Sequence, residues 1–327
     1  MAVRNLVDTI RDTLHQEMAR DPRIVVLGED VGVAGGVFRA TAGLLSAFGE
    51  HRVIDTPLAE SGIVGVAIGL SLNGMVPVAE IQFADFIHSA LDQLISEAAR
   101  IRYRSNGDFY CPLVVRVPYG GAIHGGLYHS QSVEALFAHV PGLRVVAPST
   151  PYDAAGMLRA AIRCQDPVIF LEHKAVYRLV KEEVPDEEYT VPLDRAAVRK
   201  EGSRLTLLTY GLMLHHSLAV AQELEREGVS VEVIDLRSLA PLDKETILGS
   251  VRKTGRALIV HEDNLTGGLG GEVAAIIVQE AFDSLDAPVT RLAGEDVPAF
   301  PFAPPLEEAA IPNREKILAA IQELAAY

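Results

Sequence analysis

Cysteine is scarce in this chain, since its 327 residues include only Cys111 and Cys164. The pair forms no metal-binding pattern, and so low a content is typical of proteins from a reducing compartment. The opening Met-Ala-Val-Arg-Asn-Leu-Val-Asp lacks the pattern of a signal or transit peptide. No apolar run reaches the length of a membrane span. The sequence therefore predicts a cytoplasmic protein.

Basic residues are also few. The chain has 29 lysines and arginines and 44 aspartates and glutamates, which gives a net charge of −15. Such a chain is not expected to bind nucleic acid or an anionic membrane. Residues 201–327 carry 10 basic and 20 acidic groups (net −10), whereas residues 1–200 carry 19 and 24 (net −5). We therefore expect basic protein surfaces as partners. The acidity of the C-terminal part indicates either a docking surface or, as is more common, only a contribution to solubility.

Phosphate-binding and hydrolase motifs are missing. The sequence contains no Walker motif, His-Glu-x-x-His or Gly-x-Ser-x-Gly. Gly267-Gly-Leu-Gly-Gly271 does not complete a dinucleotide fingerprint, because Leu269 or Val273 stands where a glycine is required. We interpret it as a tight turn from a strand into a helix.

What is present is an alternation of short β-branched runs with segments of helical spacing, which predicts parallel sheets covered by helices on both faces. Expected strands are Ile24–Leu27, Val53–Ile54, Val76–Ile81, Leu113–Val117, Arg144–Ala147, Val168–Leu171, Leu205–Thr209, Val231–Leu236, Ala257–His261 and Val289–Leu292. Expected helices are Val3–Arg20, one from Ile63 onward, Phe86–Arg102, Tyr152–Ile162, Leu214–Glu225, Lys244–Thr254, Gly271–Phe282 and Arg314–Leu324. The acid-rich segment Lys181–Pro192, with two prolines, reads as a linker. The pattern predicts two α/β domains, the second smaller.

Glu60 is the charged residue that most needs explaining, because its neighbours up to Leu72 are small or apolar. A carboxylate in such a place is costly unless it exchanges a proton or a hydrogen bond with a partner. The alternative is a structural acid in the first turn of a helix, stabilised by the helix dipole. If that helix has Thr56 as its N-cap and Pro57 as its first residue, the capping-box position is Ala59 and not Glu60.

Three further candidates follow predicted strands. The glycine-rich loop Gly120–Gln131 carries His124, expected at the surface, and His129, for which a proton-transfer role is favoured. Glu80-Ile-Gln-Phe-Ala-Asp-Phe86 puts two aromatic rings near one sheet edge, either as core or as a surface for a planar heterocycle. Gly28-Glu-Asp-Val-Gly32 closes the first strand with two acids, for which the structural alternative is a helix cap or a solvated turn.

Eight motifs in order resemble the β subunit of thiamine-diphosphate-dependent 2-oxoacid dehydrogenases. They are Gly28-Glu-Asp-Val-Gly, Asp55-Thr-Pro-Leu-Ala-Glu-Ser-Gly, Glu80-Ile-Gln-Phe-Ala-Asp-Phe, His129-Ser-Gln, Pro141-Gly-Leu-Arg-Val-Val, Ser149-Thr-Pro-Tyr-Asp-Ala, Asp166-Pro-Val-Ile-Phe-Leu-Glu and Asp235-Leu-Arg-Ser-Leu-Ala-Pro-Leu-Asp. The resemblance spans essentially the whole chain. It implies two three-layer α/β domains: a pyrimidine-binding domain at 1–185 and, after a linker at 186–200, a transketolase C-terminal type domain at 201–327.

The resemblance also implies the chemistry, oxidative decarboxylation of a 2-oxoacid with transfer of the acyl group to lipoamide. Glu60 is then the acid that hydrogen-bonds ring nitrogen N1′ of the cofactor, and Phe86 packs on its aminopyrimidine. Glu29 lies near the cofactor, and His129 assists proton transfer during acylation. The substrate is then a branched-chain 2-oxoacid or pyruvate. Gly126-Leu-Tyr-His-Ser-Gln and Val260-His-Glu-Asp-Asn-Leu-Thr-Gly-Gly resemble the branched-chain type, whereas the Gly28-Glu-Asp-Val-Gly motif fits either.

Partners follow from a missing motif. The family's diphosphate and Mg²⁺ are held by Gly-Asp-Gly, and this chain has only Gly107-Asp-Phe109. The resemblance therefore implies an α subunit that holds the Mg²⁺ in an α₂β₂ heterotetramer. The same complex would contain dihydrolipoamide dehydrogenase and a lipoyl acyltransferase, whose basic peripheral domain would dock on the acidic C-terminal domain. The family's loop for a monovalent cation such as K⁺ falls on Leu113, Ala161, Ile162, Cys164 and Asp166.

Two rival hypotheses make different predictions. A non-catalytic scaffold subunit that only docks an acyltransferase predicts that Glu60→Gln leaves the activity of the complex unchanged. A self-contained nucleotide-binding enzyme predicts tight nucleotide binding by the isolated chain, and the missing phosphate loops argue against it.

Overall fold

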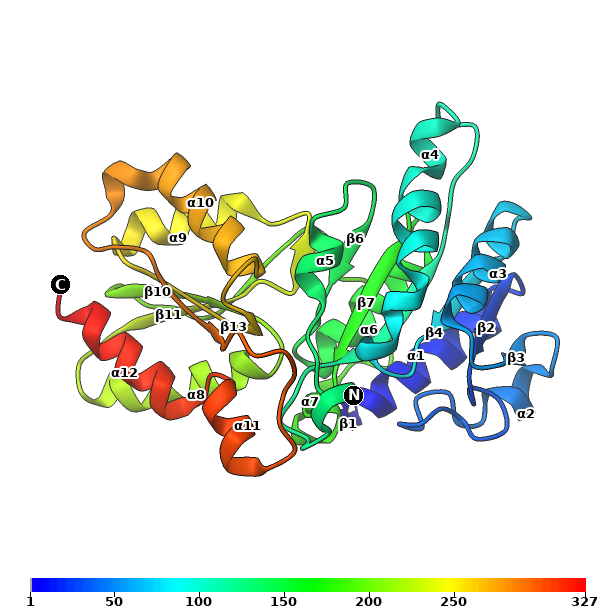
Figure 1. The fold of residues 1–327 in the computed structure, drawn as a ribbon, viewed down its shortest axis with the longest axis horizontal. Coiled ribbons are helices and arrows are strands. Elements are labelled where there is room, and N and C mark those ends of the chain that lie inside the picture. Colours follow the sequence, from blue (N-terminus) through cyan, green and yellow to red (C-terminus); the bar gives the residue numbers. More distant parts are fainter. Residues whose placement is uncertain (1) are drawn as a thin grey trace. The chain divides into compact units, whose positions relative to one another are not determined.

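The computed structural model describes residues 2–327, which form two compact units. One unit consists of residues 2–119 and 136–193, and the other of residues 120–135 and 194–327. Both contain a largely parallel sheet with helices packed on it (Figure 1). The predicted α/β class with parallel sheets is confirmed.

The sheet of the first unit has the strand order β6-β7-β5-β4-β2-β3, and all of these neighbours are parallel. Its strands are β2 (Ile24–Gly28), β3 (Val53–Asp55), β4 (Val76–Glu80), β5 (Val114–Tyr119), β6 (Arg144–Val146) and β7 (Val168–His173). Strands β2, β4, β5 and β7 are buried at every position, as expected of a sheet covered on both faces. The carboxyl ends of β2, β3 and β4 therefore lie together at one edge, where candidate site residues follow.

Helices of the first unit cover this sheet, with α1 packed against α6 and α3 packed on β4 (Figure 1). They are α1 (Leu6–Arg20), α2 (Leu44–Phe48), α3 (Glu60–Leu72), α4 (Ile101–Arg104), α6 (Pro151–Ile162) and α7 (Val176–Leu179). Helix α5 (Glu134–Ala138) lies where the chain passes back from the second unit to the first.

Two sequence predictions about the first unit are wrong. The chain starts with β1 (Ala2–Asn5), which pairs antiparallel with β8 (Lys181–Val184), so the first helix does not begin at Val3 and the predicted linker begins as a strand. The N–H of Asp8 donates to the Asn5 side chain, which caps α1 and sets its start at Leu6.

The segment Phe86–Arg102 is not one regular helix. It is divided into η1 (Ala84–Ala90), a π-helical η2 (Gln93–Glu97), η3 (Ala98–Arg100) and the short α4. The apolar spacing predicted helix but could not show which turns would be wound tighter or wider, because such irregular turns depend on the surrounding packing.

The sheet of the second unit has the order β14-β13-β10-β11-β9, in which only β9 is antiparallel to its neighbour. Its strands are β9 (Ala197–Lys200), β10 (Leu205–Thr209), β11 (Val231–Asp235), β13 (Ala257–Asn264) and β14 (Thr290–Gly294), and β12 (Ser238–Ala240) is a further short strand. The helices are α8 (Leu212–Arg226), α9 (Lys244–Thr254), α10 (Leu269–Ala281), α11 (Pro304–Ala310) and α12 (Arg314–Ala325), with short turns η4 (Gly126–Tyr128) and η5 (Phe282–Ser284). Helix α9 packs against α10, and α12 packs against α8 (Figure 1). The elements that were not predicted from the sequence are the strands β1, β8, β9 and β12 and the helices α2, α5, α7 and α11.

Candidate active site

Glu60 is the first residue of α3. The helix has Ala59 as its N-cap and no side-chain cap, so the alternative start at Pro57 is wrong by three residues. Glu60 therefore lies at the positive end of the helix dipole, half-buried. The Ser89 hydroxyl donates a hydrogen bond to Glu60 Oε2 at 3.0 Å. That contact leaves the Oε1 oxygen of Glu60 available for another donor.

Asp55, at the end of β3, connects this segment to the loop that follows β2. Its carboxylate accepts hydrogen bonds from the backbone N–H groups of Gly32 at 2.6 Å and Val33 at 3.0 Å. The N–H of Thr56 in turn donates to the carbonyl of Gly28 at 2.9 Å. These bonds hold the two loops side by side at the carboxyl edge of the sheet.

Glu29 lies within the first of these loops and interacts electrostatically with Glu60. Its pKa is raised, chiefly because burial disfavours the charged carboxylate and further because the negative charges of Asp30 and Glu60 are near. Glu29 thus prefers its protonated form more than an ordinary glutamate. The structure brings together Glu29 and Glu60, two of the predicted site residues.

Aromatic rings occupy the next strand end. Phe86 is half-buried at η1, and its ring meets that of Phe83 edge-on with centroids 5.8 Å apart. Phe83 also contacts the Phe38 ring at 5.4 Å, and the Lys174 ammonium lies 5.8 Å from its centroid. Phe83 is therefore packed among other rings and a lysine, and Phe86 is half-buried beside it.

A buried ion network underlies the same edge, and the sequence analysis missed it. The Arg116 guanidinium on β5 donates to both oxygens of Glu172 on β7 at 2.7 Å each, and it also contacts Glu80 on β4. The Tyr177 hydroxyl donates to Glu172 at 2.5 Å. Burial raises the pKa of Glu80 and of Tyr177. A charge inside an apolar strand was the available signal, because a buried arginine requires carboxylate partners.

The loop that carries His129 belongs to the second unit. The N–H of Gly120 donates to the carbonyl of Gln131 at 3.0 Å and closes the loop. His129 is half-buried and follows η4, with its N–H on the carbonyl of Gly126 at 3.3 Å. His124 lies at the surface as predicted, although its ring also contacts the buried carboxylate of Glu307.

Other buried titratable groups lie near this loop within the second unit. The Tyr210 hydroxyl donates to Glu134 at 2.8 Å, and burial raises the pKa of Glu134 well above its usual value. Burial likewise raises the pKa of Asp263 to about 6. It lowers the pKa of the buried His261 to about 4, because the charged imidazolium is disfavoured away from water.

His261 also explains the glycine-rich turn before α10. The N–H of Gly270 donates to His261 Nε2 at 3.2 Å, and a Cβ on Gly270 would lie only 2.5 Å from that nitrogen. A Cβ on Gly268 would lie 2.7 Å from the same ring. The glycines make room for a buried imidazole, so the interpretation as a strand-to-helix turn is confirmed.

The five residues predicted for a monovalent cation are near one another. Ala161 and Ile162 end α6, Cys164 and Asp166 follow it, and the carbonyl of Leu113 accepts the N–H of Val168 at 2.8 Å. The Asp166 carboxylate pairs with Arg102 at 2.7 Å, so it already has a cation partner. At the end of α6, the carbonyl of Ala161 accepts the N–H of Cys164 at 3.1 Å.

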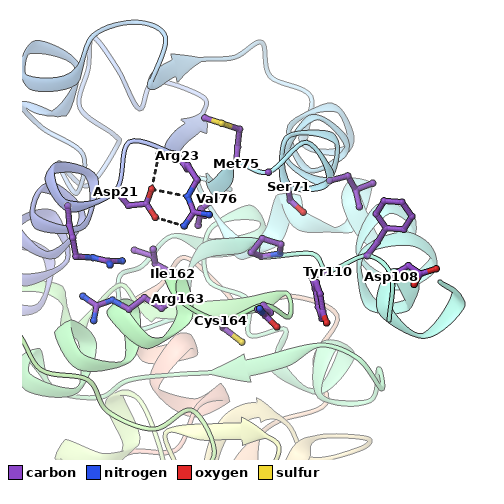
Figure 2. A pocket seen from close by; sticks show the side chains of 16 residues that line it. Asp21, Arg23, Ser71, Met75, Val76, Asp108, Tyr110, Ile162, Arg163 and Cys164 are labelled. Carbon is purple, nitrogen blue, oxygen red and sulfur yellow. Dashed lines mark hydrogen bonds and ion pairs between the residues drawn. The ribbon is translucent and has the colours of Figure 1, made fainter. Parts of the chain in front are cut away.

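A cavity of about 550 Å³ borders this loop (Figure 2). It is lined by Ile162, Arg163 and Cys164 on one side and by Arg23, which is paired with Asp21, on another (Figure 2). Among residues 2–327, no three His, Cys, Asp or Glu side chains are grouped so as to hold a metal ion. Across the same residues no helix is both long and apolar enough to cross a membrane.

Comparison with known proteins agrees with this architecture. Residues 4–180 match the transketolase pyrimidine-binding domain, and residues 194–317 match the transketolase C-terminal domain. The chain is 56% identical to the 2-oxoisovalerate dehydrogenase subunit beta of Bacillus subtilis, over 100% of both chains. It is 50% identical to the pyruvate dehydrogenase E1 component subunit beta of that organism and 48% identical to that of Staphylococcus epidermidis, in each case over 97% of both chains.

Among solved structures, a split-gene transketolase in an inactive β4 tetramer is similar, with a TM-score of 0.79 and 26% identity over 99% of this chain and 98% of that one. The two domain matches and the identity over the full length point to the same family. This chain belongs to the family of 2-oxoisovalerate and pyruvate dehydrogenase β subunits, which the sequence motifs had indicated.

Proposed function

We propose that this chain is the β subunit of a 2-oxoacid dehydrogenase that acts with thiamine diphosphate at a site completed by an α subunit. The reaction is oxidative decarboxylation of a 2-oxoacid with transfer of the acyl group to lipoamide. A branched-chain 2-oxoacid is the favoured substrate, because the relative named for 2-oxoisovalerate shares more residues than those named for pyruvate. Pyruvate is the second candidate.

The observation that carries the proposal is the setting of Glu60. This acid begins α3, lies near a second acid with a raised pKa, and is half-buried in the isolated chain. Apolar side chains are exposed before Glu60, in α3 itself and in the loop after β2: Leu58 at 71%, Val66 at 56% and Val33 at 86%. The water-excluding shell expected around Glu60 is thus incomplete here, and a partner surface would complete it.

Bound thiamine diphosphate would supply a carbon nucleophile and an electron sink for decarboxylation. Glu60 would hold a proton against ring nitrogen N1′, with Ser89 fixing the carboxylate through its Oε2. Glu29, which favours protonation, would stabilise a shared proton near Glu60. Phe86 would pack on the pyrimidine ring, and His129 would move a proton during acyl transfer.

The diphosphate and its Mg²⁺ would be held by the α subunit in an α₂β₂ assembly. The missing Gly-Asp-Gly motif supports this division. The similar transketolase is split between genes, and its β4 tetramer is inactive, as expected of a site that needs a second polypeptide. A K⁺ ion at the carbonyls that follow α6 belongs to the same proposal.

The wider complex is a further part of the proposal. A lipoyl acyltransferase would dock through a basic peripheral domain, and a dihydrolipoamide dehydrogenase would complete the cycle, in the cytoplasm. The excess of acidic groups in residues 201–327 supports a basic docking partner.

Calorimetric titration tests the shared site. Thiamine diphosphate with Mg²⁺ is added to this chain alone, and then to the chain co-expressed with its α subunit. We expect heat of binding only in the second experiment. Tight binding by the isolated chain would refute the division of the site and favour a self-contained enzyme.

A further inference from the structure

The loop Gly120–Gln131 has a shape that its sequence does not favour. Ala122 and His124 have φ values of 58° and 56°, in the left-handed region that side chains with a Cβ avoid. Gly120 and Gly126 also have positive φ values, at no such cost. Contacts from elsewhere must therefore hold the two non-glycine residues in place.

Glu307, 183 residues further along the chain, provides such a contact. Its Oε2 lies 2.6 Å from the Nδ1 atom of His124 and accepts the backbone N–H of the same residue at 3.3 Å. The Glu307 side chain is only 2% exposed, whereas that of His124 is 53% exposed. The buried carboxylate of Glu307 thus contacts both the ring and the backbone N–H of the exposed His124.

Glu307 is itself well anchored. It lies in α11, where its N–H donates to the carbonyl of Ala303 at 3.0 Å and its carbonyl accepts the N–H of Ile311 at 3.1 Å. Ile311 packs in a small core with Phe300 and Ala310. The Glu307 carboxylate therefore extends from a helix that is packed against a hydrophobic core.

The same C-terminal segment meets the loop at two more glycines. A Cβ at Gly121 would lie 3.4 Å from the Oε1 atoms of both Glu307 and Glu262. A Cβ at Gly126 would lie 2.6 Å from the ring of Phe302. The loop thus lies close against residues 302–307. A Cβ at Gly126 would overlap the Phe302 ring, whereas one at Gly121 would be in ordinary contact with the two carboxylates.

We propose that Glu307 is a positioning residue, which holds the loop Gly120–Gln131 in the conformation that presents His129 for acyl transfer. The role of His129 rests on the proposed function, whereas the anchoring of the loop stands on the contacts alone. Glu307 would act through His124 and would not touch the substrate.

Hydrogen exchange in the assembled α₂β₂ protein tests the anchor directly. In Glu307→Ala we expect amide exchange within residues 120–131 to rise about tenfold, while exchange in β10 stays at the wild-type rate. Glu307→Gln keeps the shape and an acceptor oxygen, so we expect a smaller rise. Glu308→Gln, an exposed neighbour, is the matched control and should exchange like the wild type.

Two half-reactions then test the consequence. We expect Glu307→Ala to slow acylation of a free lipoyl domain about tenfold, through kcat, while decarboxylation measured with an artificial oxidant changes less than about twofold. His129→Ala should show the same pattern. Because Glu307 acts through His124, adding His124→Ala to Glu307→Ala should cause little further loss.

Unchanged exchange in both Glu307 variants would overturn the anchor, whatever the activities. Faster exchange with normal acylation would overturn the link to His129. If His129→Ala acylates the lipoyl domain normally, the proposed role of His129 fails, and the exchange data still decide whether Glu307 anchors the loop.

Discussion

Glu60 is the first residue of a helix, and exposed apolar side chains lie before it and in the same helix. The helix dipole stabilises negative charge at the start of α3. A partner that covers Leu58 and Val66 would exclude water from this surface. The proposed hydrogen bond to a cofactor nitrogen is what would distinguish Glu60 from a purely structural acid in a first helical turn.

Replacement of Glu60 by Gln should lower the turnover of the reconstituted enzyme by several orders of magnitude while the α₂β₂ assembly forms normally. The amide is close in shape and cannot take up a proton. Steady-state assays and size-exclusion chromatography provide the measurements, with Glu50→Gln, an exposed glutamate, as control. A loss of only tenfold, ~1.4 kcal/mol, would reduce Glu60 to a packing role, and no loss at all would favour the scaffold hypothesis.

His261 should make the second unit sensitive to acid. Its pKa is lowered to about 4 in the folded protein, against ~6.5 in an unfolded chain. As the pH falls, His261 therefore binds a proton in the unfolded state before it does so in the folded state. The contribution of His261 to the free energy of unfolding is fully present above pH ~6.5. It is lost toward pH ~4, by up to ~1.4 kcal/mol per pH unit.

Urea unfolding from pH 7 to pH 5 measures this loss. The stability difference between the wild type and His261→Asn should shrink as the pH falls, because the variant has no such proton to bind. The raised pKa values of Asp263 and Glu134 increase the free energy of unfolding as the pH falls, which is the opposite effect. Because both proteins contain these carboxyl groups, this effect cancels in the difference between them. Parallel curves would contradict the prediction, and the exposed His139→Asn serves as control.

At the scale of elements, the carboxyl ends of β2 and β3 are tied together by Asp55. The strands themselves are short and parallel, and their loops have no regular structure to set their relative position. One carboxylate that bridges two backbone N–H groups does so instead. The buried Arg116 network has a comparable role one layer deeper, because it joins β4, β5 and β7 at the same edge.

Asp55→Ala should free the loop after β2. Losing two hydrogen bonds to a charged acceptor should cost about 1–3 kcal/mol of stability and expose the amides of Gly32 and Val33 to faster exchange. The pKa of Glu29 should fall toward its usual value as the loop moves away from Glu60. Hydrogen exchange read by NMR follows all of these sites, and Asp108→Ala is the exposed control. Unaltered exchange at Gly32 would show that the loop is held by other contacts.

For the whole molecule, the uneven charge bears on assembly. Residues 201–327 hold two-thirds of the net charge of −15, a net of −10 from 10 basic and 20 acidic groups. An excess of negative charge raises the rate of association with a basic partner, and salt screens this attraction.

Binding of the acyltransferase peripheral domain to the α₂β₂ assembly should therefore weaken about tenfold or more when the salt concentration rises from roughly 0.05 M to roughly 0.5 M. Surface plasmon resonance gives the rates, and the association rate should change most. An affinity independent of salt would indicate docking through apolar contacts instead.

Much of the fold followed from the sequence, because apolar periodicity is a local property. The runs that became β2 and β4 are apolar at nearly every position, and those that became β10 and β11 at three of five positions; all four strands are buried throughout. Helix α9 has the bounds predicted, since Asp243 caps its start and Gly255 ends it in a left-handed conformation. Edge strands such as β1, β8 and β9 lack that pattern, and they exist only through the partners with which they pair.

The candidate site, too, was predicted only in part from the sequence. Sequence alone identified Glu29, Glu60, Phe86 and His129 as candidates, because each stands at a strand end in a pattern shared with a known family. Only the tertiary structure could show that Ser89 holds Glu60, that Arg116 requires two buried carboxylates, and that Glu307 reaches His124 from the far end of the chain. The physical reason is distance along the chain: periodicity reports the environment of each segment, whereas these contacts join residues that only folding brings together.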